Sequence, residues 1–215
     1  MLLIIHGYEI HDNKEIMDKL FRLRYDTFIL NRNWALPSRD GMEIDQYDTN
    51  ESIYFILLNE QKDIVASARI TQTLKSSLLA DLFPHLIETG ESPRGSKLYE
   101  GTRFTLSPKL RSCAEARRAR AEIGCSTVKW VLEHGGTQIQ AVVDYSSFPN
   151  MVAMSMQTRP LGLPHEYAGG QGVSGGGKCI AFRWDLSSEL IDDFQQYGGM
   201  IGRASRDTQV PCAVH

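Results

Sequence analysis

Residues 53–71 are predicted to form two neighbouring strands of a β-sheet. Two apolar runs, 53–58 and 64–71, are separated by the polar stretch NEQKD, a pattern typical of an antiparallel hairpin. Successive side chains of a strand point to opposite faces, so Arg69 is predicted to point away from the face that carries Ile70. A hairpin of this kind needs further strands and covering helices to form a stable domain.

The rest of the chain supplies those elements in alternation. Strands are predicted at 2–10, 98–106, 137–144 and 179–186. Helices are predicted after Asp12, at 78–87 with a break at Pro84, at 112–135, at 148–157 and at 188–197. Asp12 with Glu15, and Ser112 with Glu115, have the spacing of capping boxes. The order predicts an α/β sandwich around one mixed sheet, formed as a single domain by residues 1–198. The polar tail, 199–215, is predicted to be mobile.

Composition excludes several classes of protein. The chain has 215 residues and a net charge of -3, which disfavours a protein built to neutralise nucleic-acid phosphates. No apolar run approaches the ~20 residues of a membrane span, and the N-terminus lacks the basic start of a signal peptide. The four cysteines show no spacing typical of metal ligands. We therefore expect a cytoplasmic protein, monomeric and without a bound metal.

The segment 31–48, NRNWALPSRDGMEIDQYD, is unusual for a surface loop. It contains Trp34 and the acids Asp40, Glu43, Asp45 and Asp48. The preceding helix places Phe21, Arg24 and Phe28 on one stripe at i, i+3 and i+7. Taken singly, the aromatic residues fit a core, the aspartates fit turn caps and Arg24 fits a solvated helix face.

The strand LYEGTRFTL, 98–106, carries a second pair of charges. In a regular strand Glu100 and Arg103 lie on opposite faces. Gly101 between them allows a β-bulge, which would bring both side chains toward one cleft. In that arrangement Arg103 would pair with Glu100 and keep its carboxylate ionised.

The ordered set of these residues resembles one family. Arg24, Phe28, Trp34, Asp45 and Asp48, then Arg69, Phe83, Glu100 and Arg103, are similar in order and spacing to the signature of LuxI-type acyl-homoserine-lactone synthases. The local text FRLRYDTF, NRNWAL, DQYD and YEGTRF agrees with it. The resemblance covers some 80 residues, and the carboxy-terminal half is similar only through its element order and the stretch PLGLP.

The resemblance implies an N-acetyltransferase-like fold, with three α/β/α layers and a mixed, mostly antiparallel twisted sheet. It implies an acyltransferase that makes a quorum-sensing signal. Such an enzyme acylates the amine of S-adenosylmethionine from an acyl thioester, carried by acyl carrier protein or coenzyme A. It then closes the lactone and releases methylthioadenosine. S-adenosylmethionine is a consumed substrate, and no cofactor is implied.

The resemblance also suggests roles for single residues. Expected catalytic residues are Glu100 as general base, with Arg103, Asp45, Asp48 and Arg69. Expected S-adenosylmethionine contacts are Arg24, Phe28, Trp34, Arg103 and Phe104. The acyl chain is expected against Phe83, Val143, Tyr145, Met151 and Met154. Segment 31–48 would form a lid, in which Trp34 covers the sulfonium cation.

Two alternatives remain from the residues alone. An N-acyltransferase of the same fold that acts on another amine would not need Trp34 or the acids of the lid. A ligand-binding module without catalysis would keep the fold but show no turnover. Acyl choice is also open, because Asp144, Tyr145 and Ser146 stand where many members that make 3-oxo products have a threonine. A basic cluster could dock an acidic carrier protein. It comprises Arg111, Arg117, Arg118 and Arg120.

Overall fold

The computed structural model describes residues 1–167 and 177–201. Within them one sheet runs through the molecule in the order β1-β4-β5-β6-β7-β10-β8, with β9 added beside β10. Its strands are β1 (Leu2–His6), β4 (Ile53–Leu58), β5 (Ile64–Gln72), β6 (Leu98–Leu106), β7 (Gln138–Asp144), β8 (Arg159–Pro160), β9 (His165–Tyr167) and β10 (Gly177–Asp185). A separate small hairpin pairs β2 (Ser38–Arg39) with β3 (Met42–Glu43).

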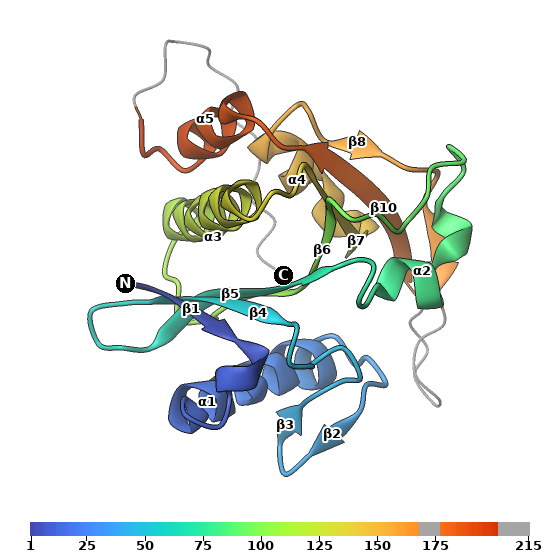
Figure 1. Cartoon of the computed structure of the whole chain (residues 1–215). Coiled ribbons are helices and arrows are strands. Elements are labelled where there is room, and N and C mark those ends of the chain that lie inside the picture. Colours follow the sequence, from blue (N-terminus) through green and yellow to red (C-terminus); the bar gives the residue numbers. More distant parts are fainter. Residues whose placement is uncertain (168–176, 202–215) are drawn as a thin grey trace.

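Helices cover both faces of the sheet (Figure 1). α1 (Lys14–Arg24) lies on one face, and α2 (Leu78–Leu82) lies farther along toward β10. The other face carries α3 (Cys113–Glu133), α4 (Phe148–Met154) and α5 (Ser188–Tyr197). The predicted three-layer sandwich with a mostly antiparallel mixed sheet is confirmed.

Strand β4 shows how the sequence builds both interfaces. All six of its residues are buried, and they alternate between two cores. Phe55 and Leu57 join the core under α3 and α5, whereas Tyr54 and Ile56 join the core under α1. A strand buried on both faces is apolar throughout, as this one is in the sequence.

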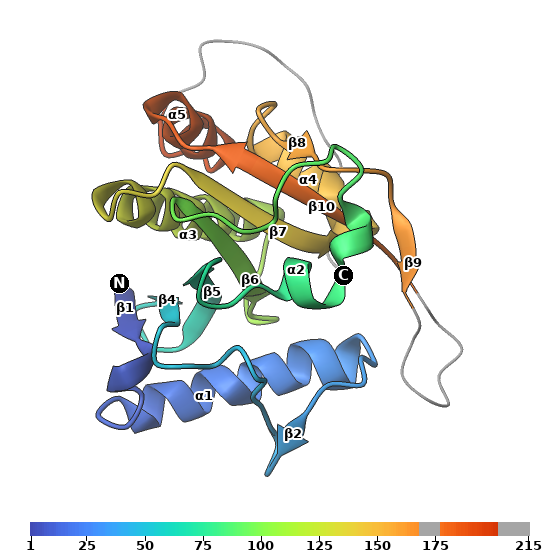
Figure 2. The same ribbon diagram turned by 45° about the vertical axis from the view of Figure 1, so that its right-hand side comes forward.

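Among the described strands, one pairing is parallel, and this short pairing lies between β6 and β7. It joins 98–101 to 138–141, while every other ladder of the sheet is antiparallel. Beyond Gly101 and Ala141 the two strands diverge (Figure 2). The remainder of β6, 102–106, and the end of β7, 142–144, therefore face each other without a ladder between them.

Several local predictions need correction. The strand predicted at 2–10 ends at His6, because Gly7 begins a 3-10 turn and packs against the backbone of Thr49. The Asp12–Glu15 capping box is wrong, since α1 starts after Asn13 with no side-chain cap. Ser112, in contrast, caps α3 by accepting from the backbone N–H of Glu115. Of the predicted tail, residues 202–215 lie outside the described residues.

Candidate active site

A β-bulge in β6 shapes the center of the site. β5 and β6 pair regularly up to Arg69 and Thr102, and resume at Ser67 and Thr105. One residue of β5 is therefore opposed by Arg103 and Phe104. Arg103 has a φ of 51°, in the left-handed region that non-glycine residues rarely adopt. The bulge predicted at Gly101 thus lies two residues later, at a strained residue of the predicted site.

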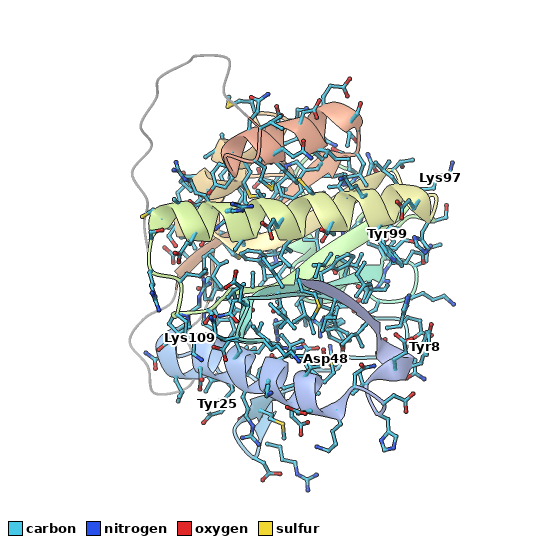
Figure 3. The ribbon with its side chains drawn as sticks, turned by 90° about the vertical axis from the view of Figure 1, so that its left-hand side faces the viewer. Tyr8, Tyr25, Asp48, Lys97, Tyr99 and Lys109 are labelled. Carbon is cyan, nitrogen blue, oxygen red and sulfur yellow. The ribbon has the colours of Figure 1, made fainter. Side chains whose placement is uncertain are left out.

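Three arginines converge on three carboxylates between α1 and the sheet. Arg24 forms two parallel hydrogen bonds of 2.8 Å to Asp48, and its Nε lies 2.6 Å from Glu43. Arg69 Nη1 lies 2.6 Å from Asp45 and 2.7 Å from Asp48. Arg103 contacts Glu43 at 2.8 Å and Asp45 at 2.7 Å. Figure 3 shows Asp48 in this layer. We call these six residues the ion network.

The ion network is buried and its formal charges balance. Arg24, Arg69 and Glu43 are each at most 1% exposed. Burial alone would raise the pKa of Asp48, but the hydrogen bonds and charges of Arg24 and Arg69 hold that pKa well below its usual range. The solvated-arginine alternative for Arg24 is therefore wrong. Arg69 points away from the face that carries Ile70, as predicted, but its side chain is buried in the ion network and does not reach solvent.

Arg103 differs from the other two arginines because part of its guanidinium remains available. Its side chain is 8% exposed, and its Nη1 makes no hydrogen bond within the described residues. Its Cζ lies 5.4 Å from the ring center of Phe28. The network therefore presents one open cationic edge beside an aromatic surface.

Phe28 and Trp34 form that surface. Their rings stack with centers 5.3 Å apart and planes 8° from parallel. Phe28 lies in a π-helical extension of α1, Tyr25–Asn31, and its carbonyl accepts a hydrogen bond from the backbone N–H of Trp34. Such π segments are rare and are frequently found at functional sites.

Glu100 lies apart from Arg103, which corrects the predicted pair. Its carboxylate is 1% exposed and accepts hydrogen bonds from the backbone N–H groups of Leu78, at 2.5 Å, and Leu79, at 2.9 Å. No ion pair with Arg103 is present within the described residues. Burial raises the pKa of Glu100 to about 7, against the opposing effect of those two hydrogen bonds. Burial therefore favours the protonated form of Glu100, and no arginine among the described residues opposes that effect.

Comparison with known proteins shows which family the chain belongs to. Residues 8–154 match the model of the autoinducer synthases. The chain belongs to the autoinducer synthase family. The expected acyl-homoserine-lactone synthase, a transferase, is confirmed by this membership.

Individual relatives agree over most of the chain. An isovaleryl-homoserine lactone synthase of Bradyrhizobium diazoefficiens is 27% identical over 165 residues, which are 76% of this chain and 73% of the relative. An acyl-homoserine-lactone synthase of Ralstonia nicotianae is 27% identical over 176 residues, 79% of this chain and 81% of the relative. A solved CoA-dependent acyl-homoserine lactone synthase with SAM and isopentyl-CoA superposes with a TM-score of 0.78 at 24% identity. It covers 98% of this chain and 95% of that structure.

The acyl-binding set predicted for this synthase does not form one pocket. Phe83 packs beside Leu79 on the α2 side of the sheet. Val143, Met151 and Met154 pack on the opposite side, under α3 and α5. Tyr145 is 48% exposed and belongs to neither cluster. On β7 itself, Val142 belongs to the cluster of Phe83 and Val143 to the cluster of Met154, because successive residues of a strand face opposite sides.

The sequence pattern missed several residues of this synthase. Glu43 holds two arginines, and its signal was its place among the acids of segment 31–48. Tyr54 donates to Asp48, and Thr102 accepts from Arg69, but neither has a distinctive sequence context. Phe104 is the second residue of the bulge and is 36% exposed, without stacking on Phe28 or Trp34 in the described structure. Its contact with substrate stays a prediction.

The described residues contain no group of three or more histidine, cysteine or acidic side chains placed to hold a metal ion. Their helices also include none with the length and hydropathy that a membrane crossing requires.

Proposed function

We propose that this synthase acylates S-adenosylmethionine and closes the product to an N-acyl-homoserine lactone. The neutral amine attacks the thioester carbonyl, so that a C–N bond forms, the C–S bond breaks and the thiol leaves with a proton. The methionyl carboxylate then attacks the carbon beside the sulfonium. The C–S bond electrons neutralise that sulfur, and methylthioadenosine leaves. S-adenosylmethionine is consumed, and the reaction needs no further cofactor.

The open edge of Arg103 beside the stacked Phe28–Trp34 pair carries this proposal. Every carboxylate of the ion network is already bound to arginine, so the network neither attracts nor repels a zwitterion strongly. Arg103 Nη1 can donate to the methionyl carboxylate. Trp34, which already has the Arg32 guanidinium 5.3 Å from its ring center, can bind a cation such as a sulfonium, an attraction worth roughly 0.5–2 kcal/mol. We assign Asp45, Asp48 and Arg69 to ordering segment 42–48 and Arg103, not to proton transfer.

Glu100 is the proposed general base, acting directly or through water. A base is most effective when its pKa lies near the working pH, and burial raises the pKa of Glu100 to about 7. The amine of S-adenosylmethionine needs only modest help, since α-amino groups titrate near pH 8. We expect Glu100→Gln to lower kcat at least about 100-fold while the affinity for S-adenosylmethionine stays within about twofold. Equal kcat in this variant would remove Glu100 from the mechanism.

An acyl-coenzyme A is the proposed donor, with a short branched acyl group. The Bradyrhizobium relative is named for the isovaleryl product, and the solved relative is CoA-dependent and holds isopentyl-CoA. The alternative, acyl carrier protein, would need the basic cluster of α3. Two of its members already have partners, because Arg118 pairs with Glu122 and Arg120 lies 3.5 Å from the Tyr197 hydroxyl.

One experiment tests reaction and donor together. Purified protein is given S-adenosylmethionine with a panel of acyl-coenzyme A and acyl-carrier thioesters, and mass spectrometry follows methylthioadenosine and lactone. Equal amounts of both products from one thioester support the proposal and identify its donor. Thioester consumption without methylthioadenosine would mean that another amine is acylated. Binding of S-adenosylmethionine without turnover of any thioester would favour a module without catalysis.

A further inference from the structure

Four side chains link the two halves of the chain near Trp34. Asp144, the last residue of β7, accepts from Arg32 Nη1 at 2.5 Å through one oxygen. Its other oxygen accepts from the Tyr167 hydroxyl, also at 2.5 Å. That hydroxyl in turn accepts from the indole Nε1 of Trp34 at 3.2 Å. We call Arg32, Trp34, Asp144 and Tyr167 the clasp.

The hydrogen bonds of the clasp have only one consistent direction. An indole N–H can only donate and an ionised carboxylate can only accept, so the Tyr167 hydroxyl must accept from Trp34 and donate to Asp144. Burial, followed by the bond to Asp144, raises the pKa of Tyr167 to about 12, which keeps this phenol protonated. Asp144 is thus the terminal acceptor on which the position of the indole depends.

Aromatic geometry fixes the same indole from three sides. The Trp34 ring stands edge-on to Tyr167, with centers 6.2 Å apart and planes at 90°. Its face stacks on Phe28, and the Arg32 guanidinium lies 5.3 Å from its center. Arg32 therefore contacts two members of the clasp, Asp144 through an ion pair and Trp34 through a cation–π contact.

The backbone is also shaped to admit Tyr167. Gly177 is paired with Tyr167 across β9 and β10, and a Cβ at this glycine would lie 2.6 Å from the phenol oxygen. A larger residue at position 177 would have to displace the phenol from the place where it reaches Asp144. The clasp is therefore supported by a backbone position as well as by its side chains.

The location of the clasp relates it to the reaction. β6 and β7 separate after Ala141, and Asp144 lies three residues farther along β7. Phe28 connects the clasp with the ion network, because its ring stacks on Trp34 of the clasp and lies under Arg103 of the ion network. The clasp thus ties the lid segment to the far strand at the place where β6 and β7 are not paired.

We infer that Asp144 is a positioning residue for S-adenosylmethionine binding, acting through Tyr167 and Arg32 on Trp34. This inference rests on the proposed function, in which Trp34 covers the sulfonium. It assigns Asp144 to the binding of S-adenosylmethionine rather than to the choice of acyl chain. Asp144→Asn removes the charge that holds Arg32 and Tyr167, and Tyr167→Phe removes the link to the indole. Both should release Trp34 while the ion network stays intact.

The test is the dissociation constant of S-adenosylmethionine, measured by calorimetry on the full-length protein. We expect Asp144→Asn and Tyr167→Phe each to weaken binding about tenfold, with the KM for the acyl thioester changed less than about twofold. Asp63→Asn is the matched control, because it breaks an exposed pair with Lys109 and should change neither constant. Unchanged thermal unfolding and circular dichroism exclude a folding defect.

A double variant separates positioning from an independent effect. If Asp144 acts through the indole, Asp144→Asn in a Trp34→Phe background should weaken binding by less than about twofold. The inference would be overturned if the two substitutions raised the dissociation constant by factors that multiply. It would also be overturned if the thioester KM changed while S-adenosylmethionine binding did not. The wild-type titration reports on the proposed function, whereas the ratio of variant to wild type reports on the clasp. The two can therefore fail separately.

Discussion

Replacing Glu43 by glutamine tests whether the balance of charges in the ion network stabilises this fold. The carboxylate is fully buried and binds two guanidinium groups, Arg24 and Arg103. Glutamine keeps the shape and one acceptor oxygen but leaves three arginines facing two carboxylates. Removing one partner of a buried ion pair typically costs about 3–5 kcal/mol.

A second estimate gives a similar figure. Each hydrogen bond to a charged group contributes about 1.5–3 kcal/mol, and Glu43 serves two such partners. We therefore expect a loss of about 4 kcal/mol in the free energy of unfolding. In a chain of this length that lowers Tm by about 10 °C. Urea denaturation at constant m-value measures the change. The exposed acid Asp63 provides the control, since Asp63→Asn should cost less than about 1 kcal/mol.

A charge-balanced double variant makes the reasoning refutable. Glu43→Gln with Arg103→Gln leaves two arginines for two aspartates, so it should be no less stable than Glu43→Gln alone. The coupling energy should then reach about 1–3 kcal/mol. A single-variant loss below about 1 kcal/mol, or strictly additive losses, would show that packing and not charge balance holds this layer together.

Three further predictions follow from individual residues. The folded state holds the Glu100 proton more tightly than an unfolded carboxyl of pKa 4.5, so stability should fall as pH rises from about 4.5 to about 7. Glu100→Gln should flatten that slope in denaturation curves. Gly7→Ala places a Cβ 1.8 Å from the Thr49 carbonyl oxygen and should cost about 2–3 kcal/mol in urea denaturation, whereas Gly95→Ala meets only an ordinary contact. Saturating S-adenosylmethionine should slow tryptic cleavage at Arg39, an exposed residue of segment 31–48, if that segment is a lid. An unchanged rate would count against the lid.

Elements with regular patterns could be predicted closely from the sequence. The helix predicted at 188–197 is α5, Ser188–Tyr197, and the strand predicted at 98–106 is β6. In both, the apolar spacing and the local caps or turns agree with the tertiary packing. The Asp12–Glu15 capping box fails because Gly7 and Glu9 already begin a turn that changes where α1 starts.

Side-chain environments were harder to predict than the elements that carry them. The outward face of Arg69 followed from alternation, yet its burial depends on Asp45 and Asp48, which arrive from another segment. The Glu100–Arg103 pair was inferred from their proximity in sequence, but Arg103 turns at the bulge toward Glu43. Local patterns give the direction of a side chain along a strand. Only the fold supplies its partner.

The same distinction explains why Glu100 has a different environment from the three acids of the ion network. Glu43, Asp45 and Asp48 lie within six residues, and each is neutralised by arginines from α1, β5 or β6. Glu100 is buried with no arginine to offset its desolvation. Its pKa is therefore raised, to about 7. For Asp48, the hydrogen bonds and charges of Arg24 and Arg69 outweigh desolvation and hold its pKa well below its usual range. Glu100, whose pKa burial raises to about 7, is therefore the carboxylate that we propose as the base for acylation of the amine.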